Sequence, residues 1–172
     1  ATAVACVPRD HRGRRLIRAR PGDTAPVDVA ASMEAPCDVT RLFGHVDELT
    51  DYPTWMPLAH RVSRLDPEPD GRPAWEVELR ARLGPFARSK RLRMVRTVHD
   101  PSAGHVRYER VEHDGRQHSP WVLDAEVVAD GHGSRLDMRL HYGGALWTGG
   151  VMEKVLADQI VAGREKLLEL VS

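Results

Sequence analysis

Seven stretches of the chain have the residue pattern of β-strands, in which apolar positions tend to recur at every second residue. The alternation is clearest in 74–83, 121–128 and 135–142, where the residues between the apolar positions are mostly charged. Only short, turn-rich segments separate the last six stretches, which indicates that consecutive strands are antiparallel neighbours. The predicted strands are 27–34, 61–65, 74–83, 90–99, 106–113, 121–128 and 135–142.

The stretch 145–171 follows a different period, with apolar residues at three- and four-residue steps from Met152 to Leu170. This is the pattern of one amphipathic helix. A sheet with one apolar face needs a cover, and this helix is the only predicted element long enough to provide it. The sequence therefore predicts a helix packed on a sheet, with either a filled core or a cavity between the two layers.

Shorter signals predict the connections. Two short helical segments should follow the first strand, one opened by residues 35–38 and one at 47–49. The two prolines within 52–57 should end helical structure there, because proline disrupts a helix interior. Asp114-Gly115 is the strongest hairpin signal in the chain and predicts a tight turn before the sixth strand.

This order of elements resembles the helix-grip fold of the START-like superfamily, which includes polyketide cyclases, lipid-transfer proteins and coenzyme Q-binding proteins. The resemblance covers residues 27–171. It rests on Glu34-Ala35-Pro36, Tyr52-Pro53-Thr54-Trp55-Met56-Pro57, Leu83-Gly84-Pro85-Phe86 and the helix after Gly143-Gly144. It implies an α+β fold, in which a curved antiparallel sheet of about seven strands wraps around the C-terminal helix and leaves a ligand cavity.

Composition limits the classes of partner. The chain has 172 residues, of which 41% are hydrophobic and 29% charged, and this balance is typical of one soluble domain. The formal net charge is zero, so no basic field predicts nucleic-acid binding. No apolar run approaches the roughly 18 residues of a membrane span. Two cysteines make no disulfide framework, which fits a cytoplasmic location. The sequence gives no oligomeric state.

Residues 1–26 differ from the rest of the chain, because they combine six arginines and three prolines with few large apolar groups. Such a composition buries too little surface to order itself. We predict a disordered basic tail before a single domain over 27–172. A misplaced start of the chain, or a basic arm that contacts an acidic partner, are the alternatives.

The predicted cavity wall combines apolar residues of the strands and the helix with a few polar ones. Periodicity alone also fits a filled core, and the resemblance favours the cavity. The candidate ligand-binding residues are Trp55, Trp75, Leu79, Met94, Arg96, Tyr108, Arg110, Leu123, Met138, Tyr142, Trp147 and Met152.

Two of these candidates are arginines that share a strand face with apolar neighbours. Arg96 and Arg110 lie on consecutive predicted strands, so their side chains could hold one carboxylate, phenolate or enolate oxygen. Tyr108 and Tyr142 would add hydroxyl donors. The alternatives are a β-bulge that reverses the alternation, or arginines that reach water at strand ends.

Glycines at 143, 144, 149 and 150 flank Trp147 where the last strand meets the helix. They predict a gate to the cavity, with 52–57 as a second rim, because hinges often lie at the ends of elements. The alternative is that these glycines only form a tight turn.

No pattern in the sequence predicts a metal, a cofactor or a catalytic group. The sequence has no His-x-x-x-His or Cys-x-x-Cys pair, no Gly-x-Ser-x-Gly and no phosphate-binding loop. We therefore expect a carrier or binding protein for a mid-sized hydrophobic molecule such as a lipid, polyketide or quinone. A cyclase or aromatase that uses the same cavity is the alternative, and an interaction module that acts through the basic tail is a third class.

Overall fold

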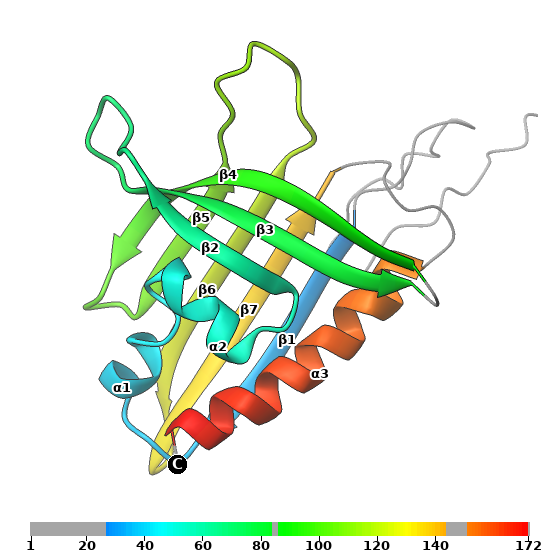
Figure 1. Cartoon of the computed structure of the whole chain (residues 1–172). Coiled ribbons are helices and arrows are strands. Elements are labelled where there is room, and N and C mark those ends of the chain that lie inside the picture. The colour runs from blue at the N-terminus through cyan, green and yellow to red at the C-terminus, as the bar shows by residue number, and fades with distance from the viewer. Residues whose placement is uncertain (1–26, 84–85, 144–150, 172) are drawn as a thin grey trace, which may run out of the picture.

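A computed structural model describes residues 27–83, 86–143 and 151–171. These residues form a curved seven-stranded antiparallel sheet, a long C-terminal helix in its concave face, and short helices after the first strand (Figure 1). The predicted α+β helix-grip architecture is therefore confirmed. The strands are β1 Val27–Ala35, β2 Ala59–Leu65, β3 Ala74–Leu83, β4 Phe86–Asp100, β5 His105–Arg110, β6 Trp121–Asp130 and β7 Gly133–Tyr142.

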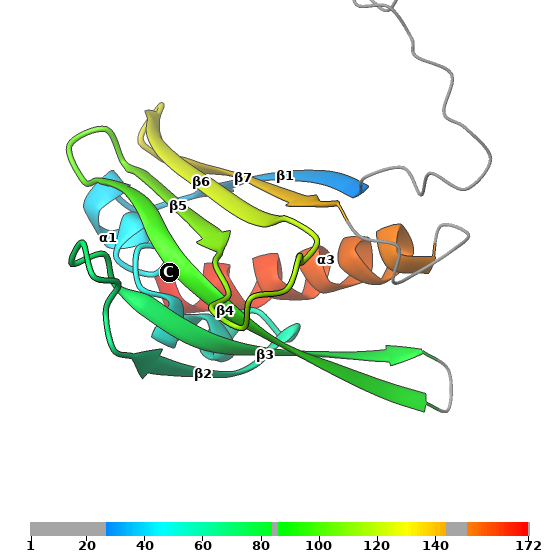
Figure 2. The ribbon, with the colours of Figure 1, turned by 90° about the horizontal axis from the view of Figure 1, so that it is seen from above.

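The strand order is β1-β7-β6-β5-β4-β3-β2, so β2 to β7 pair consecutively, as the short connections predicted. β1 is the exception, because it pairs with β7 from the other end of the chain. Its register runs from Val27 opposite Tyr142 to Ala35 opposite Ser134. The sheet curls so that α3 (Val151–Val171) lies between the β1–β7 part and the β3–β2 part (Figure 2).

The helices after β1 begin and end at capping residues. The Asp38 side chain accepts a hydrogen bond from the Arg41 backbone N–H (2.9 Å) and caps α1 (Val39–Phe43). A 3₁₀ turn, η1 (Leu49–Asp51), leads directly into α2 (Tyr52–Trp55). Helical structure ends within 52–57 as expected, at Trp55 shortly before Pro57. Pro53 does not end it, because it lies in the first turn of α2, where proline needs no N–H partner.

The tight hairpin predicted from Asp114-Gly115 is also wrong. β5 ends at Arg110 and β6 begins at Trp121, so ten residues connect them. Gly115 does turn the chain with a φ of 71°. Within this loop, Glu112 Oε1 accepts from Arg110 Nε (2.7 Å), and His118 Nδ1 accepts from Arg110 Nη2 (3.0 Å). These bonds hold 112–118 beside the end of β5.

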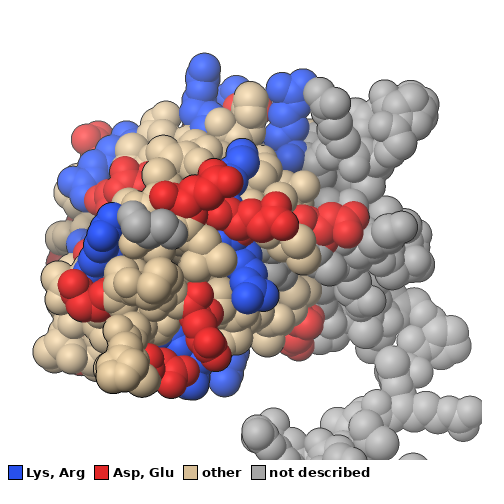
Figure 3. Space-filling model, turned by 90° about the horizontal axis from the view of Figure 1, so that it is seen from below, with Lys and Arg blue, Asp and Glu red and all other residues tan. Residues whose placement is uncertain are grey.

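The outer surface carries both signs of charge. On the face in Figure 3, Lys and Arg are interspersed with Asp and Glu over the described residues. Many charges on the outer strand faces are paired, such as Arg135 with Asp137 (3.0 Å) and Arg107 with Glu109 (2.9 Å). This face therefore presents no field of a single sign.

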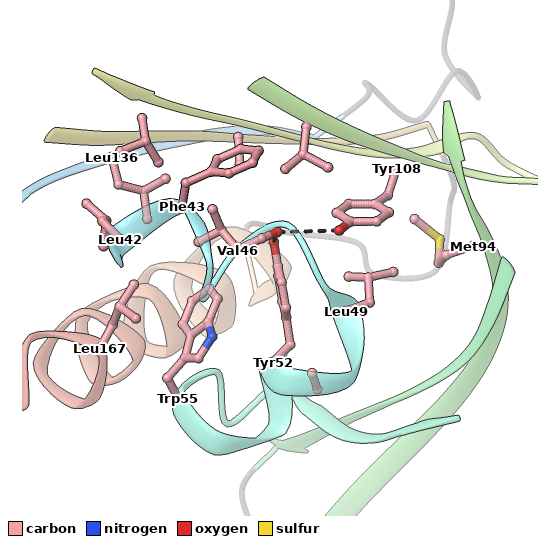
Figure 4. Close-up of a cluster of buried hydrophobic side chains, with 14 of the residues drawn as sticks. Leu42, Phe43, Val46, Leu49, Tyr52, Trp55, Met94, Tyr108, Leu136 and Leu167 are labelled. Atoms are coloured by element: carbon pink, nitrogen blue, oxygen red, sulfur yellow. Dashed lines mark hydrogen bonds between the residues drawn. The ribbon is translucent and has the colours of Figure 1, made fainter. Parts of the chain in front are cut away.

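A cluster of buried hydrophobic side chains lies where the segment from α1 to α2 packs into the sheet (Figure 4). Tyr52 and Tyr108 point toward each other there, and both hydroxyls donate to the Val46 carbonyl oxygen (3.0 and 3.4 Å). Leu42 and Leu167 are fully buried beside them. The α1–α2 segment therefore fills one end of the concave face with aromatic and aliphatic side chains.

Candidate functional site

A cavity of about 110 Å³ lies between the inner face of the sheet, the α2 region and α3. Strands β1, β3, β4, β6 and β7 contribute to its wall, so the wall comes from both ends of the chain. The sheet residues of the wall are Val29, Ala31, Ser32, Met33, Val77, Leu79, Leu92, Met94, Trp121, Leu123, Leu136, Met138 and Leu140. The remaining wall residues are Leu49, Trp55, Met56, Leu58, Gln159, Gly163, Arg164 and Leu167.

The wall is built from cross-strand rows that the alternation of β6, β7 and β1 produces. Directly opposite residues of antiparallel strands share a face. Leu123, Leu140 and Val29 form one such row, and all three line the cavity. The parallel rows are Ala125, Met138 and Ala31, and then Val127, Leu136 and Met33.

Methionine is concentrated at this cavity. The chain has five methionines, and four of them line the wall, namely Met33, Met56, Met94 and Met138. Methionine is unbranched and polarisable, so its side chain adapts to apolar groups of irregular shape. The polar wall residues are few: Ser32 on β1, with Gln159 and Arg164 on α3.

Five of the twelve predicted ligand-binding residues lie on this cavity: Trp55, Leu79, Met94, Leu123 and Met138. Trp147 lies outside the described residues, and so does most of the gate predicted around it. Met152 falls within α3, but its side chain is not among those described. A ligand contact by Trp147 or Met152 stays a prediction.

Trp75 and Tyr108 lie in the filled end of the core instead of on the cavity wall. Both are fully buried, their rings meet edge to face with centroids 5.5 Å apart, and Trp75 Nε1 donates to Glu48 Oε1 (2.7 Å). Burial raises the pKa of Tyr108 well above its ordinary value, which keeps the phenol protonated as a donor to the Val46 carbonyl. The α1–α2 segment covers these inward-facing residues.

Arg96 and Arg110 both have partners within the protein. Arg96 Nη1 donates to the Asp47 carbonyl oxygen (3.0 Å), and its guanidinium lies 5.7 Å from the centre of the Trp75 ring. A register shift follows Arg96, but Arg96 itself pairs with the inward-facing Tyr108, so the β-bulge considered as an alternative does not move Arg96 to the outer face. Arg110 is held by Glu112 and His118. Neither arginine lines the cavity, and a role for them in ligand binding stays a prediction.

Tyr142 lies beside the cavity wall. Its ring packs against Trp121 with centroids 4.9 Å apart, and Trp121 is a wall residue that the sequence did not single out. The alternation in β1, β6 and β7 could have found Trp121, Leu140 and Met33. No local signal marks Leu49 and Leu58, which reach the wall only because the α2 region folds over the sheet.

The described residues contain neither a metal-binding cluster nor a membrane-spanning helix. Among the described ranges 27–83, 86–143 and 151–171, no group of three or more His, Cys, Asp and Glu side chains is placed to hold a metal ion. Within the same ranges, no helix has both the length and the apolar composition needed to cross a membrane.

The fold and the cavity define a helix-grip protein of the START-like type. A family model described as "Polyketide cyclase / dehydrase and lipid transport" matches residues 26–171, and the chain belongs to this family. A search of the curated proteins gave no significant match.

Solved structures share this fold at low sequence identity. A START superfamily protein from Mycobacterium smegmatis is 16% identical with a TM-score of 0.64, over 84% of this chain and 96% of that one. The Zhui aromatase/cyclase from Streptomyces sp. R1128 is 13% identical with a TM-score of 0.60, over 84% and 93%. Major latex-like protein 151 from Panax ginseng is 11% identical with a TM-score of 0.61, over 85% and 97%. These likenesses concern the fold.

Proposed function

We propose that this protein carries a mid-sized hydrophobic molecule, such as a lipid, polyketide or quinone, in the cavity between the sheet and α3. The observation that supports this most is the chemistry of the wall, whose described residues are apolar except for Ser32, Gln159 and Arg164. An apolar cavity with few convergent polar groups is the usual form of a site for a hydrophobic ligand.

The expected affinity is moderate. Burial of about 300 Å² of apolar ligand surface yields roughly 7 kcal/mol at ~25 cal/mol per Å². The loss of translational and rotational freedom offsets part of this gain, and an affinity near micromolar results. This range suits a carrier that must both load and release its cargo.

The cavity volume of about 110 Å³ sets a condition on this function. An engineered cavity of about 150 Å³ holds benzene, whereas sites for larger ligands span roughly 300–1,000 Å³. A lipid-sized ligand must therefore displace wall side chains. The unbranched side chains of Met33, Met56, Met94 and Met138 can change rotamer at low cost, so they are the groups that make room.

A carrier is favoured over a cyclase because the described wall offers no acid or base. Cyclisation and dehydration need a group that moves protons, such as an imidazole or a carboxylate. No histidine, aspartate or glutamate is among the described residues that line the cavity. The family description and the likeness to an aromatase/cyclase keep the enzyme as the second candidate. Turnover of a synthetic poly-β-ketone by the purified protein would decide for it.

The proposal is tested with a substitution on β1 that places a larger side chain in the cavity. Ala31 lines the wall, whereas Ala30 lies on the opposite, outer face of the same strand and is exposed. The neutral dye N-phenyl-1-naphthylamine, which fluoresces in apolar surroundings, should bind the unaltered protein with one-to-one stoichiometry. Ala31→Phe should weaken binding about tenfold, or about 1.4 kcal/mol, because the ring occupies the space of the dye.

Ala30→Phe is the matched control and should leave the dissociation constant within about twofold. Circular dichroism should confirm that both variants fold. Equal dye binding by Ala31→Phe and the unaltered protein, or no binding by the folded unaltered protein, would show that this cavity is not the binding site.

A further inference from the structure

Lys90 on β4 is a charged residue on the inner face of the sheet. It alternates with Leu92 and Met94, which are buried and line the cavity, and it pairs directly with Leu79, another wall residue. Directly opposite residues share a face of the sheet. The Lys90 side chain therefore projects from the inner, concave face, where it is half-buried.

Lys90 is not itself one of the lining residues, but aromatic contacts connect its ammonium group to the cavity wall. Lys90 Nζ is 5.1 Å from the centre of the Tyr142 ring, and this ring packs on Trp121 of the cavity wall. β5 ends at Arg110, opposite Met94, so the part of β4 that carries Lys90 extends beyond β5. Lys90 thus reaches across the gap after β5 toward the end of β7.

No carboxylate neutralises this cation. Over the ranges that the structure describes, no acidic side chain lies within 4.0 Å of Lys90 Nζ, and its close partner is the face of Tyr142. The nearby Glu112 is already bonded to Arg110 Nε at 2.7 Å. A cation–π contact at an exposed or half-exposed site is weaker than a charge-assisted hydrogen bond to an anion. The Lys90 N–H donors are therefore available to a ligand.

The electrostatic surroundings also favour a negative group. Burial, and after it the charge of Arg110, lowers the pKa of Lys90, whereas the charge of Glu112 has a smaller effect in the opposite direction. An anion beside Nζ would counter both effects. Its attraction would be strengthened by the apolar wall, because charges interact more strongly where water is scarce.

We propose that Lys90 is the polar anchor of the cavity and that the ligand is an amphipathic anion, with its acid group on Lys90 and its apolar body against the cavity wall. This inference rests on the proposed ligand-binding function and names the chemical class of the ligand. It differs from the anchor expected at Arg96 and Arg110, whose guanidinium groups bond to the protein itself.

The experiment compares an acid with its ester. Decanoate and methyl decanoate are titrated against N-phenyl-1-naphthylamine bound to the unaltered protein and to Lys90→Met. Lys90→Met removes the charge and keeps most of the side-chain volume, so the affinity for decanoate should fall at least tenfold. The affinity for methyl decanoate should change less than about twofold, since the ester has no charge to lose.

Two further variants give the controls. Arg91→Met removes the adjacent cation, which lies on the outer face with 66% of its side chain exposed, and should leave both affinities unchanged. Lys90→Arg keeps the charge and should retain the preference for the acid. If folded Lys90→Met loses affinity for the acid and the ester equally, or keeps both affinities, Lys90 is not the anchor. The proposal that the cavity binds a hydrophobic ligand is unaffected by this result. Failure of the dye to bind the unaltered protein overturns both proposals.

Discussion

At the residue scale, the most enclosed carboxylate described lies outside the cavity. Glu68, between β2 and β3, is only 6% exposed. It accepts hydrogen bonds from Arg93 Nη2 (2.8 Å) and from His113 Nε2 (3.0 Å). These bonds, first from Arg93 and then from His113, lower the pKa of Glu68. Glu68 therefore joins the β2–β3 connection to β4 and to the loop after β5.

This lowered pKa predicts a pH-dependent contribution to stability. Because the pKa is lower in the folded state, the contribution is present above the unfolded-state value of about 4.3 and is lost as the pH falls through the folded-state pKa. Glu68→Gln should reduce the free energy of unfolding by about 2 kcal/mol at pH 7. Urea denaturation should show this difference shrinking once the pH falls below about 4.

Asp66→Asn is the control for this measurement, since Asp66 is exposed on the same connection. It should change the free energy of unfolding by less than about 0.5 kcal/mol. If Glu68→Gln and the unaltered protein instead differ in free energy of unfolding by a constant amount down to pH 3.5, that result contradicts a role for the charged carboxylate.

At the element scale, the contact of α2 with α3 closes one side of the cavity. Gly163 lies at this contact, and a Cβ atom at this position would lie 3.4 Å from the Trp55 carbonyl oxygen and 3.8 Å from Met56 Cα. A methyl group fits at these distances in ordinary van der Waals contact. Gly163 also lines the cavity, so the packing of the two helices and the shape of the site depend on the same residue.

Substitutions at Gly163 should therefore raise or lower the free energy of unfolding according to the size of the new side chain. Gly163→Ala should raise the free energy of unfolding by up to about 1 kcal/mol, because alanine favours the helix. Gly163→Leu should lower it by about 1–3 kcal/mol, because the side chain forces α2 away from α3.

Val161→Leu is the control for these two variants, at a position of α3 that is 59% exposed, and should have little effect. Thermal denaturation of the three variants measures the differences. Stabilisation by Gly163→Leu would mean that α2 and α3 do not pack closely in solution.

At the scale of the whole molecule, β1 closes the structure. It completes the sheet by pairing with β7, contacts α3, and supplies Val29, Ala31 and Met33 to the cavity. The chain before β1 is predicted from its composition to contribute nothing to this closure. We therefore predict the boundary between tail and domain at the start of β1.

Removal of residues 1–25 should leave the free energy of unfolding and dye binding unchanged within about 0.5 kcal/mol. Removal of residues 1–35 takes β1 away, exposes the edge of β7 and opens the cavity, so this shorter chain should not fold. Urea denaturation and dye titration of both proteins test the boundary. A marked loss of stability on removal of residues 1–25 would show that the tail packs on the domain.

The strands, the covering helix and the inward face of each clear strand can be predicted from the residue pattern alone. This is possible because alternation and the helical period are local properties of the chain, and they are strong in β3, β6, β7 and α3. The rows through Leu123 and Met138 follow from the same alternation once the strands pair consecutively. The local signals were weaker at turns, where side-chain bonds such as Arg110 to Glu112 changed the course of the chain.

Which inward residues line a cavity and which fill the core depends on how distant segments of the chain pack together. Trp75 and Leu79 share one face of β3, yet Trp75 is covered by the segment that carries Glu48, and Leu79 borders the cavity. Likewise, Arg96 finds its acceptor at Asp47, 49 residues earlier, while Lys90 has no acidic partner among the described residues. These outcomes depend on contacts between distant segments, and the period of a strand carries no information about what packs against its face.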